Sequence, residues 1–210
     1  MRFADLDAVT VDGYGTLLEL VDPVGALQRT LAEHDVELSN EEVARAFAAE
    51  ARHYRPRSHL GRDERSLAKL RHECVAVFLQ ALESPLSVES FTPAFIGALE
   101  FAPVNGAIET LERLEAQGLA LAVVANWDCA LPEHLARLGL DRFFETVVTS
   151  ADAGVAKPDP AIFRLALERI GARPSRSLHV GDEAADEQGA AAAGMRFVHA
   201  PLARAFEGWA

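Results

Sequence analysis

The chain has 210 residues and a mass of 22.7 kDa, which suits one domain with a sizeable insertion or two small domains. Half of its residues are hydrophobic and a quarter are charged, a composition typical of a globular protein and not of a disordered one. The net charge of −12 argues against a general nucleic-acid binder and against a protein that docks on an anionic membrane surface.

The sequence also bears on the compartment. No apolar run approaches the roughly 20 residues needed to span a bilayer. Residues 1–9 carry acids where a signal peptide has a basic stretch followed by a long apolar one. The two cysteines, Cys74 and Cys129, lie far apart in the sequence, so a disulfide is a weak expectation. We therefore expect a reduced, cytoplasmic protein that binds neither nucleic acid nor membrane.

The first predicted strand runs over residues 7–11, and the segment after it has a different character. Residues 19–95 carry helical patterns and no strand pattern. Ser39 and Glu42 have the spacing of a capping box, and a second helix is predicted over residues 64–82. We therefore predict a helical insertion over residues 19–95, with residues 1–18 and 96–210 forming the other domain.

The C-terminal half alternates short apolar runs with amphipathic ones. The predicted helices have recognisable ends: Asn105 caps a helix that stops at Gly118, and Asp159 caps one that Gly171 closes. Strands that alternate with helices indicate an α/β fold with a doubly wound parallel sheet, covered on both faces. The predicted strands here are residues 119–124, 144–149, 177–180 and 195–199, with a further helix over 131–138.

Four groups of residues fall at the ends of these predicted strands, where ligands bind in open parallel sheets. An acid at such a place can act as a nucleophile, and a glycine-rich turn lets backbone N–H groups approach an anion. The groups are Asp12 with Gly13, Tyr14, Gly15 and Thr16; Ala125 with Asn126 and Trp127; Lys157; and Asp182 with Asp186.

These groups, with the stretches AKPDPAIF and HVGDEAAD, resemble the haloacid dehalogenase superfamily over nearly the whole chain. The resemblance implies a Rossmann-like core and a helical cap. It also implies that Asp12 attacks the substrate and becomes a covalent aspartyl intermediate, while Lys157 neutralises charge around it. The implied Mg²⁺ ligands are Asp12, the backbone carbonyl of Tyr14, Asp182 and Asp186. The implied substrate-binding residues are Thr16, Ala125, Asn126 and Trp127.

Two positions depart from the pattern of the family's phosphatases. Tyr14 replaces the acid that protonates the leaving group, and Ala125 replaces a Ser/Thr hydroxyl that holds phosphate, although the backbone N–H of Asn126 survives that change. The family's 2-haloacid dehalogenases also carry Tyr at the first of these positions, because a halide leaves without a proton. They work without a metal, and their fourth motif is typically not acidic. The first motif thus resembles a dehalogenase and the fourth a phosphatase.

Electrostatics favours the phosphatase. Asp12, Asp182 and Asp186 would converge with Lys157 as the only evident cation, and uncompensated carboxylates raise one another's pKa. A Mg²⁺ ion would relieve this, and oxygen ligands suit it. We expect a Mg²⁺-dependent phosphatase-type hydrolase acting on a small anionic substrate with a good leaving group. A 2-haloacid dehalogenase is the alternative, and a Mg²⁺- and anion-binding module with poor turnover is the third hypothesis.

Two further features allow a functional and a plain interpretation. Residues 51–72 hold seven Lys/Arg against two acids, a local charge of +5 that would steer an anionic substrate or would simply be a solvated loop. Trp127 would line a substrate pocket or take part in ordinary packing. His179, inside a predicted strand, is interpreted as a packed core histidine in preference to a base.

Overall fold

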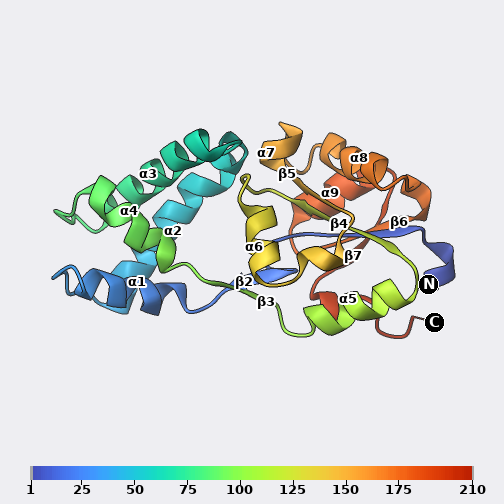
Figure 1. The fold of residues 1–210 in the computed structure, drawn as a ribbon, viewed down its shortest axis with the longest axis horizontal. Helices are drawn as coiled ribbons and strands as arrows, with labels where there is room; N and C mark the ends of the chain where they lie inside the picture. The colour runs from blue at the N-terminus through green and yellow to red at the C-terminus, as the bar shows by residue number, and fades with distance from the viewer. Residues whose placement is uncertain (1, 210) are drawn as a thin grey trace. The chain divides into compact units, whose positions relative to one another are not determined.

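The computed structural model describes residues 2–209. The chain divides into two compact units, one formed by Met1–Glu19 with Ala102–Ala210 and the other by Leu20–Phe101 (Figure 1). None of the described helices has both the length and the apolar character that a membrane crossing requires.

A five-stranded sheet forms the centre of the first unit, with the strand order β5-β4-β1-β6-β7. All four neighbouring pairs are parallel, as the alternation of strands and helices predicted. The three middle strands are buried at nearly every position, which is why they are almost continuous apolar runs. The strands are β1 (Ala8–Val11), β4 (Ala120–Ala125), β5 (Thr146–Thr149), β6 (Ser177–Gly181) and β7 (Arg196–His199).

Helices cover both faces of this sheet, so the predicted doubly wound α/β fold is confirmed. Helices α8 (Pro160–Arg169) and α9 (Ala184–Ala192) lie on one side and α5 (Ala107–Ala116) lies on the other (Figure 1). The shorter helices of this unit are α6 (Leu131–Arg137), α7 (Ser150–Ala153) and α10 (Leu202–Ala205).

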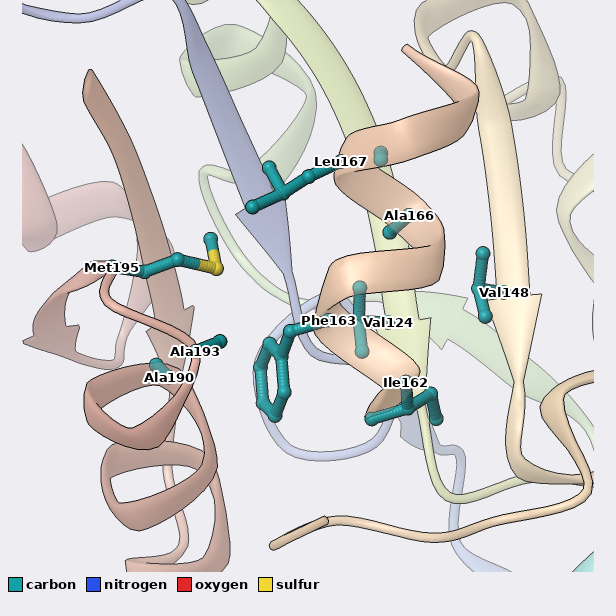
Figure 2. Close-up of a cluster of buried hydrophobic side chains, with 10 residues drawn as sticks. Val124, Val148, Ile162, Phe163, Ala166, Leu167, Ala190, Ala193 and Met195 are labelled. Carbon is teal, nitrogen blue, oxygen red and sulfur yellow. The ribbon is translucent and has the colours of Figure 1, made fainter. Parts of the chain in front are cut away.

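Helix α8 packs against α9 and the sheet, next to the loop that carries Lys157 and the helix that carries Asp186. Phe163 of α8 lies between α8 and α9 (Figure 2), within a cluster that includes Val124 of β4 and Val148 of β5. Gly189 of α9 lies so close to α8 that a Cβ there would come within 2.4 Å of Phe163 Cε2. The two helices therefore approach closely, and their first turns are held near the same edge of the sheet.

The structure confirms the helix caps predicted at Asp159 and at Ser39, and the cap predicted at Asn105 is wrong. Asp159 caps α8 by accepting a 2.9 Å hydrogen bond from the Ala161 N–H. Asn105 does not cap α5. The residue before that helix is Gly106, which has φ +77° and makes no side-chain cap. A glycine in the left-handed region turns the chain into the helix and leaves Asn105 one residue too early to cap it.

The second unit is helical and has its own apolar core. Its buried cluster includes Leu31, Val43, Phe78 and Phe95, and the ring centroids of Phe78 and Phe95 are 4.9 Å apart. The predicted capping box of Ser39 and Glu42 is present. The helices are α1 (Pro23–Ala32), α2 (Asn40–Tyr54), α3 (Glu64–Ala81) and α4 (Val88–Gly97).

Three short elements in or beside this unit were not predicted from the sequence. The basic segment between α2 and α3 forms a 3₁₀ helix, Arg55–Leu60, in which Arg57 donates a 3.0 Å hydrogen bond to the carbonyl of His53. Strands β2 (Leu18–Leu20) and β3 (Phe101–Pro103) pair where the chain passes between the two units. Strands of three residues are too short to give a periodic pattern in the sequence.

Candidate active site

The carboxyl ends of three adjacent strands bring the predicted residues together. Asp12 follows β1, Ala125 ends β4 and Asp182 follows β6, and β1 lies between β4 and β6 in the sheet. Lys157 comes from the loop before α8, and Asp186 from the first turn of α9. The residues therefore lie at one edge of the sheet, as the strand ends predicted.

A buried cluster of charges forms around Lys157. Its Nζ contacts a carboxylate oxygen of Asp12, lies 2.6 Å from Asp186 Oδ1 and donates to the carbonyl oxygen of Val124 at 3.1 Å. The side chains of Lys157, Asp12 and Asp186 are 4%, 9% and 2% exposed. The ammonium group thus has three oxygen acceptors and almost no contact with solvent, so its charge is compensated entirely by protein.

The backbone of Lys157 is held by Asn126. The Asn126 side chain accepts a 2.7 Å hydrogen bond from the Lys157 N–H and donates a 3.1 Å bond to the Lys157 carbonyl. This closed pair of bonds fixes the loop before α8 to the end of β4. The sequence suggested only a backbone donor at Asn126, and the holding role of its side chain was missed.

The two acids beside Lys157 differ in protonation behaviour. Burial raises the pKa of Asp12 to about 6, although the charge of Lys157 opposes this rise. Burial acts in the same direction on Asp186, but the hydrogen bond from His179 and the charge of Lys157 outweigh it and lower the pKa of that carboxyl below its usual value. At neutral pH Asp186 is a fixed anion, whereas Asp12 holds its proton to a higher pH than Asp186 does.

His179 joins this cluster from β6. Its Nε2 lies 3.0 Å from Asp186 Oδ1 and its Nδ1 lies 2.8 Å from Thr10 Oγ1. The ring is fully buried, and burial is the largest cause that lowers its pKa. The interpretation as a core histidine is correct for its burial, but the contact with Asp186 was missed. The sequence did offer a signal for this contact, because Thr10 and His179 are polar residues within predicted strands that are otherwise largely apolar.

Asp182 is the solvent-exposed member of the acidic group. It packs against Gly15, which has φ +84° and where a Cβ would come within 2.4 Å of Asp182 Oδ2. Asp12, Asp182 and Asp186 each offer a carboxylate oxygen, and these atoms all lie within 4.8 Å of one another. Such an all-oxygen group fits Mg²⁺. Because Asp186 is already bound by three donors, Asp12 and Asp182 have more freedom to bind a cation directly.

The remaining predicted residues surround the turn after β1. Thr16 is fully buried, and its hydroxyl has no hydrogen-bond partner. Tyr14 is 43% exposed. Ala125 and Trp127 are buried, and both face Gly13, where a Cβ would lie 3.1 Å from the Ala125 methyl group and 3.2 Å from Trp127 Cε3. Trp127 therefore packs on the turn itself.

Comparison with known proteins gives concordant results. The family model described as haloacid dehalogenase-like hydrolase matches residues 6–194. The chain is 34% identical over 200 residues to haloacid dehalogenase-like hydrolase domain-containing protein 3 of Mus musculus, covering 89% of this chain and 78% of that protein. It is 39% identical over 101 residues to ribulose-1,5-bisphosphate 5-phosphatase of Halopiger xanaduensis, covering 47% of this chain and 42% of that protein.

A solved structure with a different activity is similar as well. It is the L-2-haloacid dehalogenase of Xanthobacter autotrophicus with chloropropionic acid covalently bound. Its TM-score is 0.69 at 25% sequence identity, with 96% of this chain and 82% of that chain covered. The fold is therefore shared with a dehalogenase, and about half of the sequence is similar to that of a phosphatase.

The charge cluster predicts a pH-dependent loss of stability in Lys157→Met. Without the ammonium group, two buried carboxylates face each other, and breaking a buried pair in this way costs about 3–5 kcal/mol. The folded-state pKa values of both acids would then lie above their unfolded values, so the variant loses stability as pH rises. We expect the difference from the wild type, measured by urea unfolding in metal-free buffer, to be larger at about pH 8 than at about pH 5.

Lys69→Met is the matched control for this variant. Lys69 is 80% exposed and lies 3.8 Å from Glu73, so its removal should change the free energy of unfolding by less than about 1 kcal/mol at either pH. Equal destabilisation of Lys157→Met at both pH values would mean that the two carboxylates do not depend on Lys157 for their charge.

Proposed function

We propose a phosphatase activity for this chain, which belongs to the family of haloacid dehalogenase-like hydrolases. The substrate would be a small phosphorylated molecule with a good leaving group, and the reaction would pass through a phosphorylated Asp12 with Mg²⁺ bound. We also propose that the protein works in the cytoplasm, for which the low cysteine content of the chain, two cysteines in 210 residues, is the supporting observation.

The observation that carries this proposal is the convergence of three carboxylates at one edge of the sheet. Oxygens of Asp12, Asp182 and Asp186 lie within 4.8 Å of one another, and Lys157 bonds to two of these acids, Asp12 and Asp186. A site with such an excess of negative charge repels an anionic substrate unless a divalent cation is present. A metal-free dehalogenation would give the exposed carboxylate of Asp182 no role in the reaction.

Each residue of the site has a proposed role in this reaction. Asp12 is mostly ionised at neutral pH because its pKa is about 6, and one of its oxygens would attack phosphorus as the leaving group departs. Lys157 would hold Asp12 in place and neutralise charge that develops on the transferred group. Bound Mg²⁺ would supply Lewis-acid stabilisation of the phosphoryl oxygens, held by Asp12 and Asp182. Water would then cleave the acyl phosphate.

Dehalogenation is the second candidate, and Tyr14 is the observation that favours it. A tyrosine cannot act as the carboxylic acid that protonates an alkoxide, and a halide needs no such proton. The likeness to the L-2-haloacid dehalogenase supports the same hypothesis. The named phosphatase from Halopiger xanaduensis, a relative of higher identity over a shorter stretch, supports the first one.

Asp12→Asn should abolish turnover and leave the fold intact. The amide is nearly isosteric but a poor nucleophile, and Asp186 still provides Lys157 with a carboxylate in that variant. The rate is measured as release of p-nitrophenol from p-nitrophenyl phosphate, and circular dichroism checks that the secondary structure is unchanged. A variant that keeps the wild-type rate, with deamidation excluded by mass spectrometry, would show that Asp12 is not the nucleophile.

Asp182→Ala should lose most of the affinity for Mg²⁺, measured by titration calorimetry, because it removes the exposed carboxylate of the cluster. Glu187→Ala is the matched control, because Glu187 is an exposed acid of α9 that does not belong to the cluster. Turnover of 2-chloropropionate that EDTA does not affect, together with wild-type Mg²⁺ titrations that show no binding, would favour the dehalogenase.

Tyr14 predicts a strong dependence on the leaving group. General acid catalysis is typically worth about 10²–10⁴-fold, and its loss matters most for a basic leaving group. We therefore expect Mg²⁺-dependent hydrolysis of aryl and acyl phosphates and little hydrolysis of alkyl phosphates. Tyr14→Asp should raise the alkyl phosphate rate, and Tyr14→Asn controls for loss of the ring alone. Equal wild-type rates on aryl and alkyl phosphates in single turnovers would contradict this account.

A further inference from the structure

The two central strands β1 and β6 each carry one polar residue at the same level of the sheet. Thr10 and His179 are register partners, and neither has any exposed surface. Their side chains meet at 2.8 Å between Oγ1 and Nδ1. Burying a polar pair in this way is unfavourable unless each group has a partner, so the arrangement calls for a reason beyond packing.

We propose that His179 is a positioning residue that, held by Thr10, donates a hydrogen bond from Nε2 to Asp186 and thereby fixes Asp186 and Lys157 against Asp12. The effect of this arrangement on turnover rests on the proposed phosphatase activity. The arrangement itself concerns only groups of this chain and exists without substrate.

The direction of each hydrogen bond follows from what the partners can do. An ionised carboxylate only accepts, so the 3.0 Å contact between His179 Nε2 and Asp186 Oδ1 requires the proton to be on Nε2. The other ring nitrogen of a neutral imidazole then accepts, and the hydroxyl of Thr10 is the donor next to it. Asp186 therefore selects the form of the ring with the proton on Nε2, and the hydroxyl of Thr10, which can donate or accept, serves as the donor to Nδ1.

The orientation of the ring is fixed by its neighbours as well. The ring of Phe163 meets it edge-on, with centroids 4.9 Å apart and an angle of 87° between the planes. Phe197 lies on β7, with centroids 6.3 Å apart. A flip of the ring would place carbon atoms where both hydrogen bonds are made, so the ring has one good orientation.

Asp186 is held at both oxygens in consequence. Its Oδ1 accepts from Lys157 and His179, and its Oδ2 accepts a 3.1 Å hydrogen bond from the Glu183 N–H. Without the His179 donor, one acceptor site of Oδ1 is left without a partner in a buried place, and the carboxylate has less to stop it from rotating. Lys157 then loses its fixed contact opposite Asp12.

Two substitutions at position 179 separate positioning from packing. In His179→Gln the side-chain amide nitrogen can reach the place of Nε2 and donate to Asp186. In His179→Asn the shorter amide reaches the place of Nδ1 and cannot. Both remove the ring, so both lose packing against Phe163. If the histidine matters only for packing, the two variants will behave alike at the site once their stabilities are compared.

The first measurement is the nitrogen spectrum of the imidazole ring in metal-free wild-type protein at about neutral pH, with the His179 signals assigned by their absence in His179→Gln. We expect a neutral ring protonated on Nε2, the form that Asp186 requires and that Thr10 supports by donating to Nδ1. In Thr10→Val, which removes the hydroxyl, the chemical shift of Nδ1 should move towards that of an imidazole nitrogen that accepts no hydrogen bond. In Thr10→Ser, which keeps the hydroxyl, this shift should stay as in the wild type. A ring protonated on Nδ1, or on both nitrogens, overturns the proposal.

The second measurement follows Lys157 itself. The chain has two lysines, and Lys69 is exposed, so lysine-specific ¹⁵N labelling gives one buried ammonium signal and one reference. We expect slow proton exchange at Lys157 in the wild type and in His179→Gln, and fast exchange or a shifted signal in His179→Asn. An unchanged Lys157 signal in His179→Asn overturns the proposal, whatever the enzyme's activity.

The third measurement is turnover of an aryl phosphate with Mg²⁺. His179→Asn should lose about 10–100-fold in kcat with a smaller change in KM, as expected when a group that orients a catalytic residue is removed. His179→Gln should keep most of the rate. Ser177→Ala controls for a general weakening of β6, because Ser177 lies on the same strand as His179 and its hydroxyl donates a 2.8 Å hydrogen bond to the Arg173 carbonyl.

The outcomes separate this proposal from the proposed function. A wild-type protein that hydrolyses no phosphate would contradict the phosphatase, while the two spectroscopic measurements would still decide whether His179 holds Asp186 and Lys157. Equal losses of kcat in His179→Asn and His179→Gln, at equal thermal stability, would contradict the positioning role even if the phosphatase activity is real.

Discussion

The ammonium group of Lys157 is the charge on which the rest of the site depends. It is buried, and burial alone would lower its pKa, but the charges of Asp12 and Asp186 raise that pKa above its usual value. The cation therefore stays charged without solvent, and in return it allows two carboxylates to exist in the interior. One positive charge thus makes possible both the buried carboxyl group of Asp12 and the fixed anion of Asp186 beside it.

Close backbone approach is what allows these charges to meet. Gly181 has no side chain at the point where a Cβ would come within 2.4 Å of the Asp186 Cγ atom. Gly189 lets α9 approach α8, whose preceding loop carries Lys157. A larger residue at Gly181 would push Asp186 away from the lysine, and one at Gly189 would push against Phe163 and the carbonyl of Pro158, next to Lys157. These two glycines therefore support the charge cluster as the acids do.

The sequence predicted what depends on local patterns. Apolar runs that end at Asp12 and Asp182 marked the strand ends, and Asp159 marked a helix start, because each depends on a few neighbouring residues. The two hydrogen bonds of Asn126 to Lys157 join residues 31 positions apart, and those of His179 depend on its register with Thr10. Such contacts are set by tertiary packing and strand pairing, which no local pattern encodes.

The strand order also determines when the site can exist during synthesis. Strand β1 leaves the ribosome first, yet its neighbours in the sheet are β4 and β6, and Asp12 lies 145 residues before Lys157. Asp12 is therefore present in the nascent chain long before Lys157, and β1 has no neighbouring strand to pair with until β4 and β6 have been made. Contacts of such sequence separation form slowly, so Asp12 becomes buried only after the segment that carries Lys157 has been made.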